Sequence, residues 1–376
     1  MKITSTIPAV LLGLVPLSAA VSVSGSAEGF ATGVTGGGDA EPQVPSDIDE
    51  LKEWLADDTP RVIVLDKEYD FTESEGTTSG TVCASWGTGD SCQKIIQDDC
   101  GDSPSSEATW YTAAVTGMDV ASNKTILGDG DKGVIKGKGL RFNNGVSNII
   151  VQNIQVSDLN PEYVWGGDAI YLDGSDLIWI DHVTTARTGR QHYTFGYNSN
   201  TRVTLSNNFI NGETSYSTGC DGYTYWGFEM VGDADQITLQ NCYIYMTAGR
   251  SPALSGGTLL HAVNNVWEKN NGHALEGGES TARGIFEGNV WLDVSTIVGD
   301  YAGQLFNTPN SSSASDCESA LGRACEVNAV GSGSGSLTSY TDTSFFSDFS
   351  GLAIAPATSA SEAQSNVPNN AGRGKL

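Results

Sequence analysis

Three charged residues lie in short motifs that could carry polar chemistry. Asp168 lies in "YVWGGDAIYLDG", Arg190 in "DHVTTARTGRQHY" and Arg250 in "TAGRSPAL". Arg250 follows a glycine and precedes Ser-Pro, the small and rigid surroundings that a closely placed group requires and a surface charge does not. The chain has only 19 Lys plus Arg against 45 Asp plus Glu, so this cation needs an explanation. A guanidinium at such a position could stabilise a developing anion, or accept a proton where its neutral form is favoured.

Histidines and paired carboxylates offer alternative chemistry. The chain has four histidines. His182 and His192 flank the arginine-bearing segment, although the histidine of "WIDHV" equally suits a packed, hydrogen-bonded role. Hydrolysis of a glycosidic bond would need two carboxylates in a cleft. The adjacent aspartates at 57–58 and 98–99 lie outside the repeated segments described next, which argues against a hydrolase.

The region after residue 120 contains short β-like segments that resemble one another, such as "VSNIIVQNIQV", "NTRVTLSNNFI" and "ADQITLQNCYIY". Each carries a recurring polar residue, at Asn153, Asp181, Asn207, Asn241, Asn265 and Asn289. A repeat of this length without intervening helices predicts a parallel β-helix, an all-β solenoid. An antiparallel sandwich is the alternative, but its turns would come more often and without a shared motif.

Stacked coils would bring distant residues together. Asp168, Arg190 and Arg250 fall in successive repeats, so we expect them to lie side by side on one face. The segment 212–232, "GETSYSTGCDGYTYWGFEMVG", is a long aromatic-rich insertion in one repeat and a candidate wall of a cleft. A flat sheet bordered by such loops suits an extended polymer.

The termini and one early segment have different patterns. Residues 1–20 read as a secretory signal peptide, because Lys2 precedes a short apolar run and small residues. Residues 21–376 should then form one catalytic domain, with an irregular C-terminal arm at about 353–376. A short helix is predicted at 46–57, with Ser46 as its N-cap.

The net charge of −26 excludes several classes of partner. Nucleic acid, an anionic membrane and a fully ionised polysaccharide would all be repelled. No later segment has the roughly 20 apolar residues of a membrane span. We therefore expect a protein without a nucleic-acid or membrane partner.

Seven cysteines indicate an oxidising compartment and leave at least one unpaired. Cys242 lies in the apolar pattern "ITLQNCYIY" and is the candidate free thiol. The local pair Cys317 and Cys325 is the bridge that the spacing favours, whereas the pairing of Cys83, Cys92 and Cys100 stays open on spacing alone. Asn123 and Asn310 begin glycosylation sequons.

The motifs "VWGGDAI", "WIDHVTTARTGRQHY", "CDGYTYWGFEM", "GRSPAL" and "LLHAVNNVWE" resemble fungal pectin lyases of polysaccharide lyase family one. The resemblance covers nearly the whole mature chain. It implies a right-handed parallel β-helix and a secreted enzyme that cleaves α-1,4 bonds of methyl-esterified polygalacturonate by β-elimination. It also implies the disulfides Cys83–Cys100 and Cys92–Cys220.

The resemblance assigns roles to the charged residues. Arg250 matches the catalytic arginine, which is taken to remove the proton on C5; stabilising the enolate is its alternative role. We expect Arg190 and the exclusion of water to favour neutral Arg250. Asp168 would orient the arginines, and Arg187 could compete with Arg190 for its role.

No metal or other cofactor is expected. Calcium-dependent relatives place acidic ligands on neighbouring strands. Asp168 matches one ligand, but Arg190 and Thr194 occupy the places of two others. One carboxylate beside a cation is a poor site for Ca²⁺, which takes six to eight oxygens.

Four aromatic residues stand in motifs that line the cleft of the family: Trp86, Trp165, Tyr225 and Trp226. They could pack against sugar rings without charge. Glu229 and Ala253 lie where some relatives carry an aromatic residue and a lysine, respectively.

We expect a monomer acting on pectin. The second alternative is a non-catalytic carbohydrate-binding β-helix, which would not need the three charged residues together.

Overall fold

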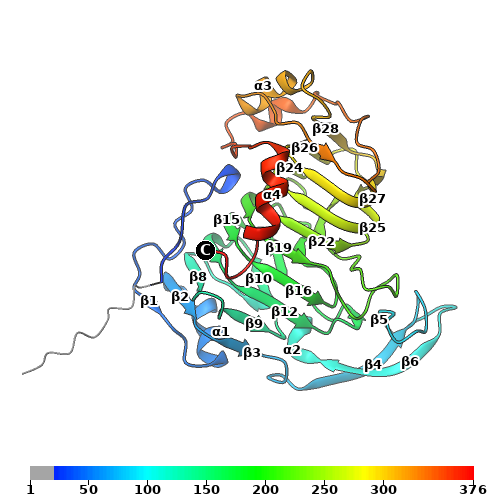
Figure 1. The fold of residues 1–376 in the computed structure, drawn as a ribbon. Helices are drawn as coiled ribbons and strands as arrows, with labels where there is room; N and C mark the ends of the chain where they lie inside the picture. The colour runs from blue at the N-terminus through cyan, green and yellow to red at the C-terminus, as the bar shows by residue number, and fades with distance from the viewer. Residues whose placement is uncertain (1–20) are drawn as a thin grey trace, which may run out of the picture.

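The computed structural model describes residues 21–376, and the predicted signal peptide lies outside the described residues. The polypeptide winds into a stack of coils whose strands pair in parallel with those of the next coil (Figure 1). The predicted parallel β-helix is therefore confirmed. Apart from these coils, a β-hairpin and several short helices decorate the stack.

The first face is a 10-stranded parallel sheet. Its order is β1 (Pro42–Gln43), β2 (Arg61–Leu65), β8 (Lys124–Gly128), β11 (Ser147–Gln152), β15 (Asp176–Asp181), β18 (Thr201–Ser206), β21 (Gln236–Gln240), β24 (Leu259–Val263), β26 (Arg283–Glu287) and β28 (Gln304–Asn307).

The second and third faces meet at one long strand, β25 (Val266–Gly277). The second face contains β3 (Glu68–Asp70), β9 (Val134–Lys136), β12 (Gln155–Leu159), β16 (Thr184–Thr188), β19 (Phe209–Asn211), β22 (Tyr243–Thr247), β25, β27 (Val290–Tyr301) and β29 (Ala329–Val330). The third contains β7 (Met118–Asp119), β10 (Leu140–Asn143), β14 (Ile170–Asp173), β17 (Tyr193–Phe195), β20 (Phe228–Met230), β23 (Ala253–Leu254) and β25.

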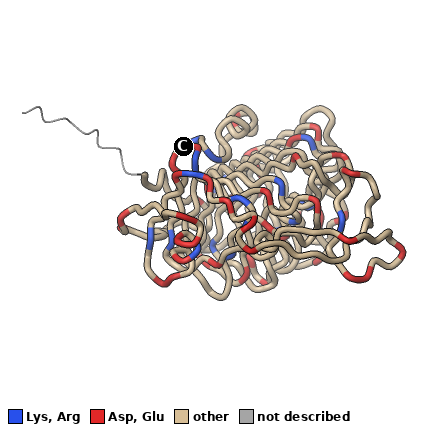
Figure 2. The backbone as a smooth tube through the Cα atoms, turned by 90° about the horizontal axis from the view of Figure 1, so that it is seen from below, with Lys and Arg blue, Asp and Glu red and all other residues tan. Residues whose placement is uncertain are grey.

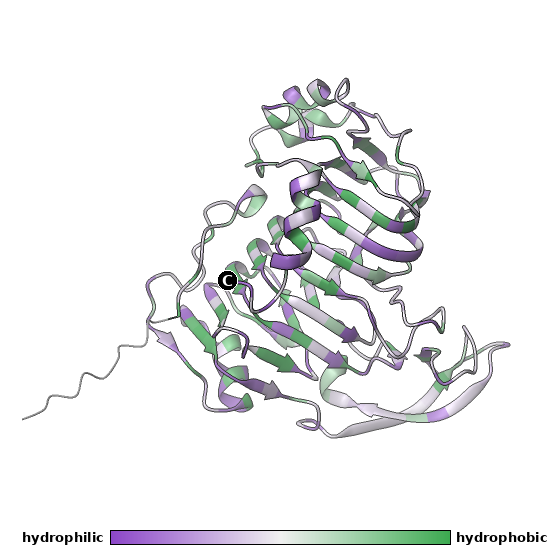
Figure 3. Ribbon diagram, in the orientation of Figure 1, coloured by the Kyte–Doolittle hydropathy of each residue, from purple (hydrophilic) through white to green (hydrophobic). Residues whose placement is uncertain are grey.

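A smaller antiparallel element projects from the stack near the third face (Figure 1). It consists of β4 (Thr77–Cys83) and β6 (Ser105–Tyr111), with β5 (Lys94–Ile96) beside β4. The short β13 (Tyr163–Val164) ties it to the coils through a parallel pairing with β5. This hairpin is more polar than the strands of the coils (Figure 3).

The interior of the stack is filled by apolar side chains in register. One row of the first sheet shows the pattern, running through Ile126, Val151, Ile180, Leu205, Leu239 and Ala262. Every member of this row is buried. Because each coil covers the apolar face of its neighbour, removal of this surface from water stabilises the whole stack.

The recurring polar residues fall into two adjacent rows rather than one. Each coil turns after the first face at a residue whose backbone has a positive φ, in the left-handed region. These residues are Asn153, His182, Asn207, Asn241, Asn264 and Gly288. Buried asparagines one position later form an amide ladder, in which Asn265 N donates to Asn289 Oδ1 and Asn289 N donates to Asn328 Oδ1, both at 2.8 Å. The predicted single row was wrong by one residue at three coils. Asn265 and Asn289 lie one position after the turning residue, because asparagine both tolerates positive φ and pairs backbone groups. Asp181 is the exception: it ends β15, one position before the turning residue His182.

The helices lie at the ends and on the outside of the stack. They are α1 (Ile48–Ala56), α2 (Thr112–Val115), α3 (Glu318–Leu321) and α4 (Ala360–Asn370). The predicted early helix exists as α1, but its N-cap is Asp47, whose carboxylate accepts from Asp49 N and Glu50 N. Leu51 and Leu55 of α1 join the core at the N-terminal end of the stack.

The prediction of an irregular C-terminal arm at about 353–376 was wrong for residues 360–370, which form α4. Ser359 and Glu362 form a capping box that starts α4. The helix then buries Ala363 and Val367 against β25 and β27 (Figure 1). Small residues in this segment therefore serve close packing of a helix on the coils.

The cysteine predictions are confirmed. Disulfides join Cys83 to Cys100, Cys92 to Cys220, and Cys317 to Cys325. Cys242 is a free, buried cysteine. The Cys92–Cys220 bridge fastens the aromatic insertion at 212–232 to the segment beside β5.

Candidate active site

The third face carries a row of side chains in register across its strands, and all but one of them are polar. The row is Arg141, Tyr171, Thr194, Glu229, Ala253 and Glu276, on β10, β14, β17, β20, β23 and β25. Neighbouring strands lie about 4.8 Å apart, so the row forms a line along the stack. The predicted charged residues surround this line.

Asp168 and Arg190 form a two-pronged ion pair at the middle of the row. Arg190 Nε and Nη2 lie 3.0 and 2.7 Å from the two carboxylate oxygens of Asp168. The same carboxylate accepts from Gln191 N and from Thr194 Oγ1. Burial would lower the pKa of Arg190, but Asp168 and Glu229 outweigh it and raise that pKa. Arg190 is thus a fixed, charged group.

Glu229 separates the two arginines that the sequence placed together. Its Oε1 lies 3.0 Å from Arg250 Nη1, and its Oε2 lies 3.5 Å from Arg190 Nη1. Gln191 Nε2 also donates to Glu229, at 3.1 Å. The expected direct opposition of the two guanidiniums is therefore replaced by a carboxylate that bridges them.

Arg250 lies over β23 between two carboxylates. Its backbone has a φ of +41°, so the side chain leaves the turn at a strained, well-defined point. Its Nε lies 3.5 Å from Glu276 Oε1, on the side opposite Glu229, and this buried Nε has no hydrogen-bond partner among residues 21–376. Glu229 and Glu276 therefore hold the Arg250 guanidinium from both sides.

Glu276 is held by two further side chains. Tyr225 Oη donates to Glu276 Oε2 at 2.7 Å, and His273 Nε2 contacts the same oxygen. Burial alone would raise the pKa of Glu276, but His273, Tyr225 and Arg250 keep it below its usual value. Burial and the bond to Glu276 raise the pKa of Tyr225 to about 12, so its hydroxyl stays a donor.

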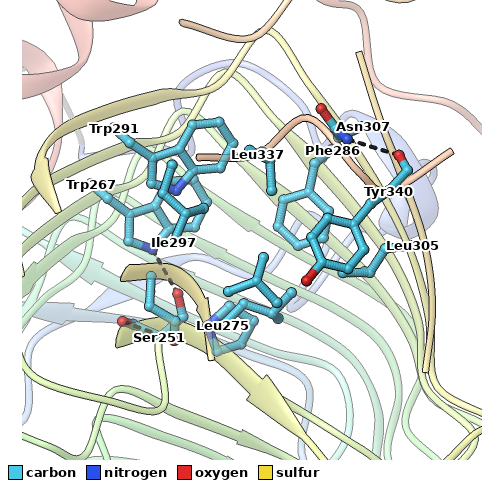
Figure 4. A pocket seen from close by; sticks show the side chains of 13 residues that line it. Ser251, Trp267, Leu275, Phe286, Trp291, Ile297, Leu305, Asn307, Leu337 and Tyr340 are labelled. Atoms are coloured by element: carbon cyan, nitrogen blue, oxygen red, sulfur yellow. Dashed lines mark hydrogen bonds between the residues drawn. The ribbon is translucent and has the colours of Figure 1, made fainter. Parts of the chain in front are cut away.

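A packed floor supports the turn that carries Arg250. The indole Nε1 of Trp267 donates to the carbonyl of Ser251 at 2.6 Å (Figure 4). Trp267 stacks on Trp291, with ring centroids 5.3 Å apart and planes 11° apart. Leu275 and Ile297 pack beside the two indoles (Figure 4). The turn that carries Arg250 therefore rests on packed aromatic rings.

The four predicted aromatic residues differ in exposure. Trp165 is 53% exposed and covers the Arg190 guanidinium at 4.4 Å. Trp86 is 37% exposed and meets Trp226 edge-on. Trp226 is only 8% exposed, because its indole donates to Gln93 and its ring faces Arg250. Trp165 and Trp86 therefore offer open faces, whereas Trp226 supports the site from behind.

Two hollows lie along the row. The larger, of about 890 Å³, is lined by Arg250, Glu229, Glu276, His273 and Tyr225 among others. The second, of about 250 Å³, is lined by Trp165, Asp168, Arg190, Tyr171 and Arg141 among others. Both open on the same sheet, so an extended chain could pass from one to the other.

The rival groups lie elsewhere. Arg187 forms a bidentate ion pair with Asp158, so it does not take the place of Arg190 beside Asp168. His182 is buried against Asp181, and burial lowers the pKa of His192 to about 4. The 57–58 aspartates belong to another region, where Asp57 binds Lys124 and Arg61.

The sequence reasoning missed Glu276 and His273. Both lie at the end of β25, one coil after Arg250, in the segment "NNGHALEGGES". The only sequence feature that could have indicated them is the length of the coil repeat, because Glu276 pairs with Ala253 and Ala253 pairs with Glu229.

Within residues 21–376, no group of three or more His, Cys, Asp or Glu is arranged to hold a metal. Over the same range, no helix is long and apolar enough to cross a membrane.

Known proteins are similar to this chain in sequence. The sequence model of the family described as pectate lyase matches residues 2–376. A protein named probable pectin lyase A from Aspergillus flavus is 88% identical over all of both chains. One named probable pectin lyase C from Emericella nidulans is 56% identical, covering 96% of this chain and 97% of its own.

Solved structures agree on the architecture. A pectate lyase bound to a hexasaccharide superposes with a TM-score of 0.60 over 94% of this chain and 98% of its own, at 16% identity. A pectate lyase variant from Xanthomonas campestris gives a TM-score of 0.60 over 93% and 99%, at 18% identity. At such identities the likeness establishes the parallel β-helix fold.

Proposed function

The chain belongs to the pectate lyase family, and on this premise we propose that it is a pectin lyase. It cleaves the α-1,4 bonds of methyl-esterified polygalacturonate by β-elimination. The observation that carries the proposal is Arg250, held between Glu229 and Glu276 over the polar row. Relatives at 88% and 56% identity bear the name probable pectin lyase.

The reaction needs a group beside C5 of the esterified sugar whose C4–O bond breaks. The C5 proton leaves, and its electron pair delocalises into the neutral ester carbonyl as an enolate. The C4–O bond then breaks, a C4=C5 double bond forms, and the departing O4 takes a proton. Arg250 serves at C5, either as proton acceptor in its neutral guanidine form or, as the cation, as the electrostatic partner of the enolate. Both roles require the same guanidinium position, which the turn and its floor fix.

Asp168 and Arg190 act as positioning groups. Asp168 fixes the Arg190 fork through two hydrogen bonds, and Arg190 in turn contacts Glu229. Glu229 reaches Arg250, so a continuous line of charge–charge contacts orients the guanidinium at the reaction centre. Trp165 and Trp86 offer exposed ring faces to the sugars.

The charge balance favours an esterified substrate that needs no calcium. Acidic residues are spread around the stack and basic ones are few (Figure 2). A fully ionised polymer would meet like charge, whereas an esterified one would not. Asp168 and Glu229 are engaged by arginines, so these two residues of the described cleft do not supply free carboxylates for Ca²⁺.

We also propose that the protein is secreted and acts as a monomer. The apolar segment at 1–20 suits a signal peptide, and three disulfides suit an oxidising compartment.

Of the two glycosylation sequons, the one at Asn310 has an exposed asparagine that could accept a glycan. Asn123 is half-buried, and its side-chain oxygen accepts a hydrogen bond from Asn148.

One assay tests the function. The purified protein is given highly esterified pectin and unesterified polygalacturonate, with and without EDTA, and the ultraviolet absorbance of the unsaturated product is followed. We expect activity to rise with esterification and to survive the chelator. New reducing ends without this absorbance would indicate a hydrolase, and loss of activity in EDTA would overturn calcium independence.

A further inference from the structure

Arg141 extends the polar row beyond the reaction centre. It lies on β10, four strand spacings from β23, the strand that follows Arg250. At about 4.8 Å per strand, this places it about 19 Å along the row from β23. A polymer lying along the row would therefore reach Arg141 several sugars away from the bond that breaks.

The Arg141 guanidinium makes only one weak contact with a carboxylate in the described range. It donates no hydrogen bond to any residue in the described range 21–376, and its closest carboxylate oxygen, on Asp119, is 3.7 Å from Nη1. Asp119 itself is largely exposed, so this contact is weak. The guanidinium carbon lies 5.5 Å from the ring centroid of Tyr171, and the side chain is 31% exposed.

The other two arginines of the cleft contrast with it. Arg190 is bound through both prongs to Asp168, and Arg250 lies between Glu229 and Glu276. Arg141 lines the smaller hollow beside these groups with its planar fork available. A free fork supported by an aromatic ring is suited to bind a carboxylate through two hydrogen bonds.

We propose that Arg141, with Tyr171 and Trp165, forms a distal subsite for the free carboxylate of an unesterified galacturonate residue. This inference rests on the proposed pectin lyase function. The sugar at Arg250 must be esterified so that its C5 proton is acidic, whereas the sugar at Arg141 is bound as the acid. Among the esterified sites of a chain, the enzyme would then bind best those that have an acid residue at this fixed distance.

The test compares three proteins on two polymers. Arg141→Gln removes the guanidinium. Arg202→Gln is the control, because Arg202 is a more exposed arginine that pairs with Asp176 on the first face, away from the cleft. The polymers are fully esterified polygalacturonate and the same material with half of its esters removed at random. We expect Arg141→Gln to lower kcat/KM about tenfold on the half-esterified polymer only, as for loss of a hydrogen-bonded charge pair.

A binding measurement completes the test without turnover. A short unesterified oligogalacturonate should inhibit the wild-type protein competitively, more weakly at high salt, and Arg141→Gln should weaken this inhibition about tenfold. Equal losses on both polymers, or unchanged inhibition, would overturn the subsite. Absence of unsaturated product from wild-type protein on fully esterified polymer would instead reject the proposed function, so the two failures are distinguishable.

Discussion

The carboxylate of Glu229 lies 3.0 Å from the Nη1 atom of Arg250. The same carboxylate reaches Arg190 on its other side, so one acidic residue keeps two cations at fixed positions in the cleft. Arg250 is therefore oriented by counter-charges from the neighbouring coils, on β20 and β25.

Arg250 itself should be essential. We expect Arg250→Ala to lower kcat about 10²- to 10³-fold, because the charge stabilisation or proton transfer at C5 is lost. Arg250→Lys separates the two roles: an electrostatic partner would be partly replaced by the ammonium charge, whereas a proton acceptor positioned by the guanidinium fork would not. Steady-state kinetics on highly esterified pectin measures both, with Arg202→Gln as control. Near-native turnover in both Arg250 variants would remove this residue from the mechanism.

Glu229→Gln should impair catalysis through Arg250. The amide cannot hold two guanidiniums by charge, so Arg250 loses its tether on one side. We expect kcat/KM to fall about tenfold to a hundredfold, the cost of a small misplacement of a reacting group. Glu268→Gln is the control, because Glu268 binds Tyr243 on the second face. Unchanged kcat/KM in Glu229→Gln would contradict the positioning role.

Trp267 should act through the turn that it supports. Trp267→Phe keeps an aromatic ring in the stack but removes the hydrogen bond to the Ser251 carbonyl. We expect a fall in kcat of about tenfold with little change in KM, because the Arg250 turn loosens. Trp291→Phe is the matched control, since it alters the same stack without touching that carbonyl.

Thermal unfolding of both variants separates stability from positioning. Comparable losses of Tm with a lower kcat only in Trp267→Phe would support the prediction. Equal kcat losses in both variants would show that the stack matters only as packing.

Acid stability should depend on Glu287, which is buried between His261 and Arg323. Burial alone would raise its pKa, but the hydrogen bonds from His261 and Arg323 lower it from 4.5 to about 2. The unfolded chain thus takes up this proton first as the pH falls. The stabilisation, of about 3 kcal/mol, is complete above pH 4.5 and is lost as the pH falls toward 2.

Denaturant unfolding at a series of pH values tests this. Glu287→Gln should be less stable at neutral pH by about 3 to 5 kcal/mol, because Arg323 and His261 lose their buried partner. It should also lose less stability than the wild type between pH 4.5 and 2. Glu107→Gln, which alters an exposed carboxylate on β6, should keep the wild-type slope. An identical slope in Glu287→Gln would refute the assignment.

The sequence by itself determined the class of fold and much of the site. Apolar and polar residues recurred at coil length, and a parallel β-helix is the arrangement that buries such repeats. Asp168, Arg190 and Arg250 were found because their motifs are distinctive, and the coil interval placed them on one face. The Cys317–Cys325 disulfide followed from its short spacing, and the other two followed from the resemblance to the family.

Tertiary structure alone decided which side chains meet. Glu229 was known only as a departure from relatives, and Glu276 lies in an unremarkable polar segment; their position beside Arg250 follows from the register between β20, β23 and β25. The exact row of the turning residues was likewise open, because asparagine fits either of two neighbouring positions. Register depends on how whole coils stack, and the contacts that set it join residues more than twenty positions apart, so no local pattern could specify it.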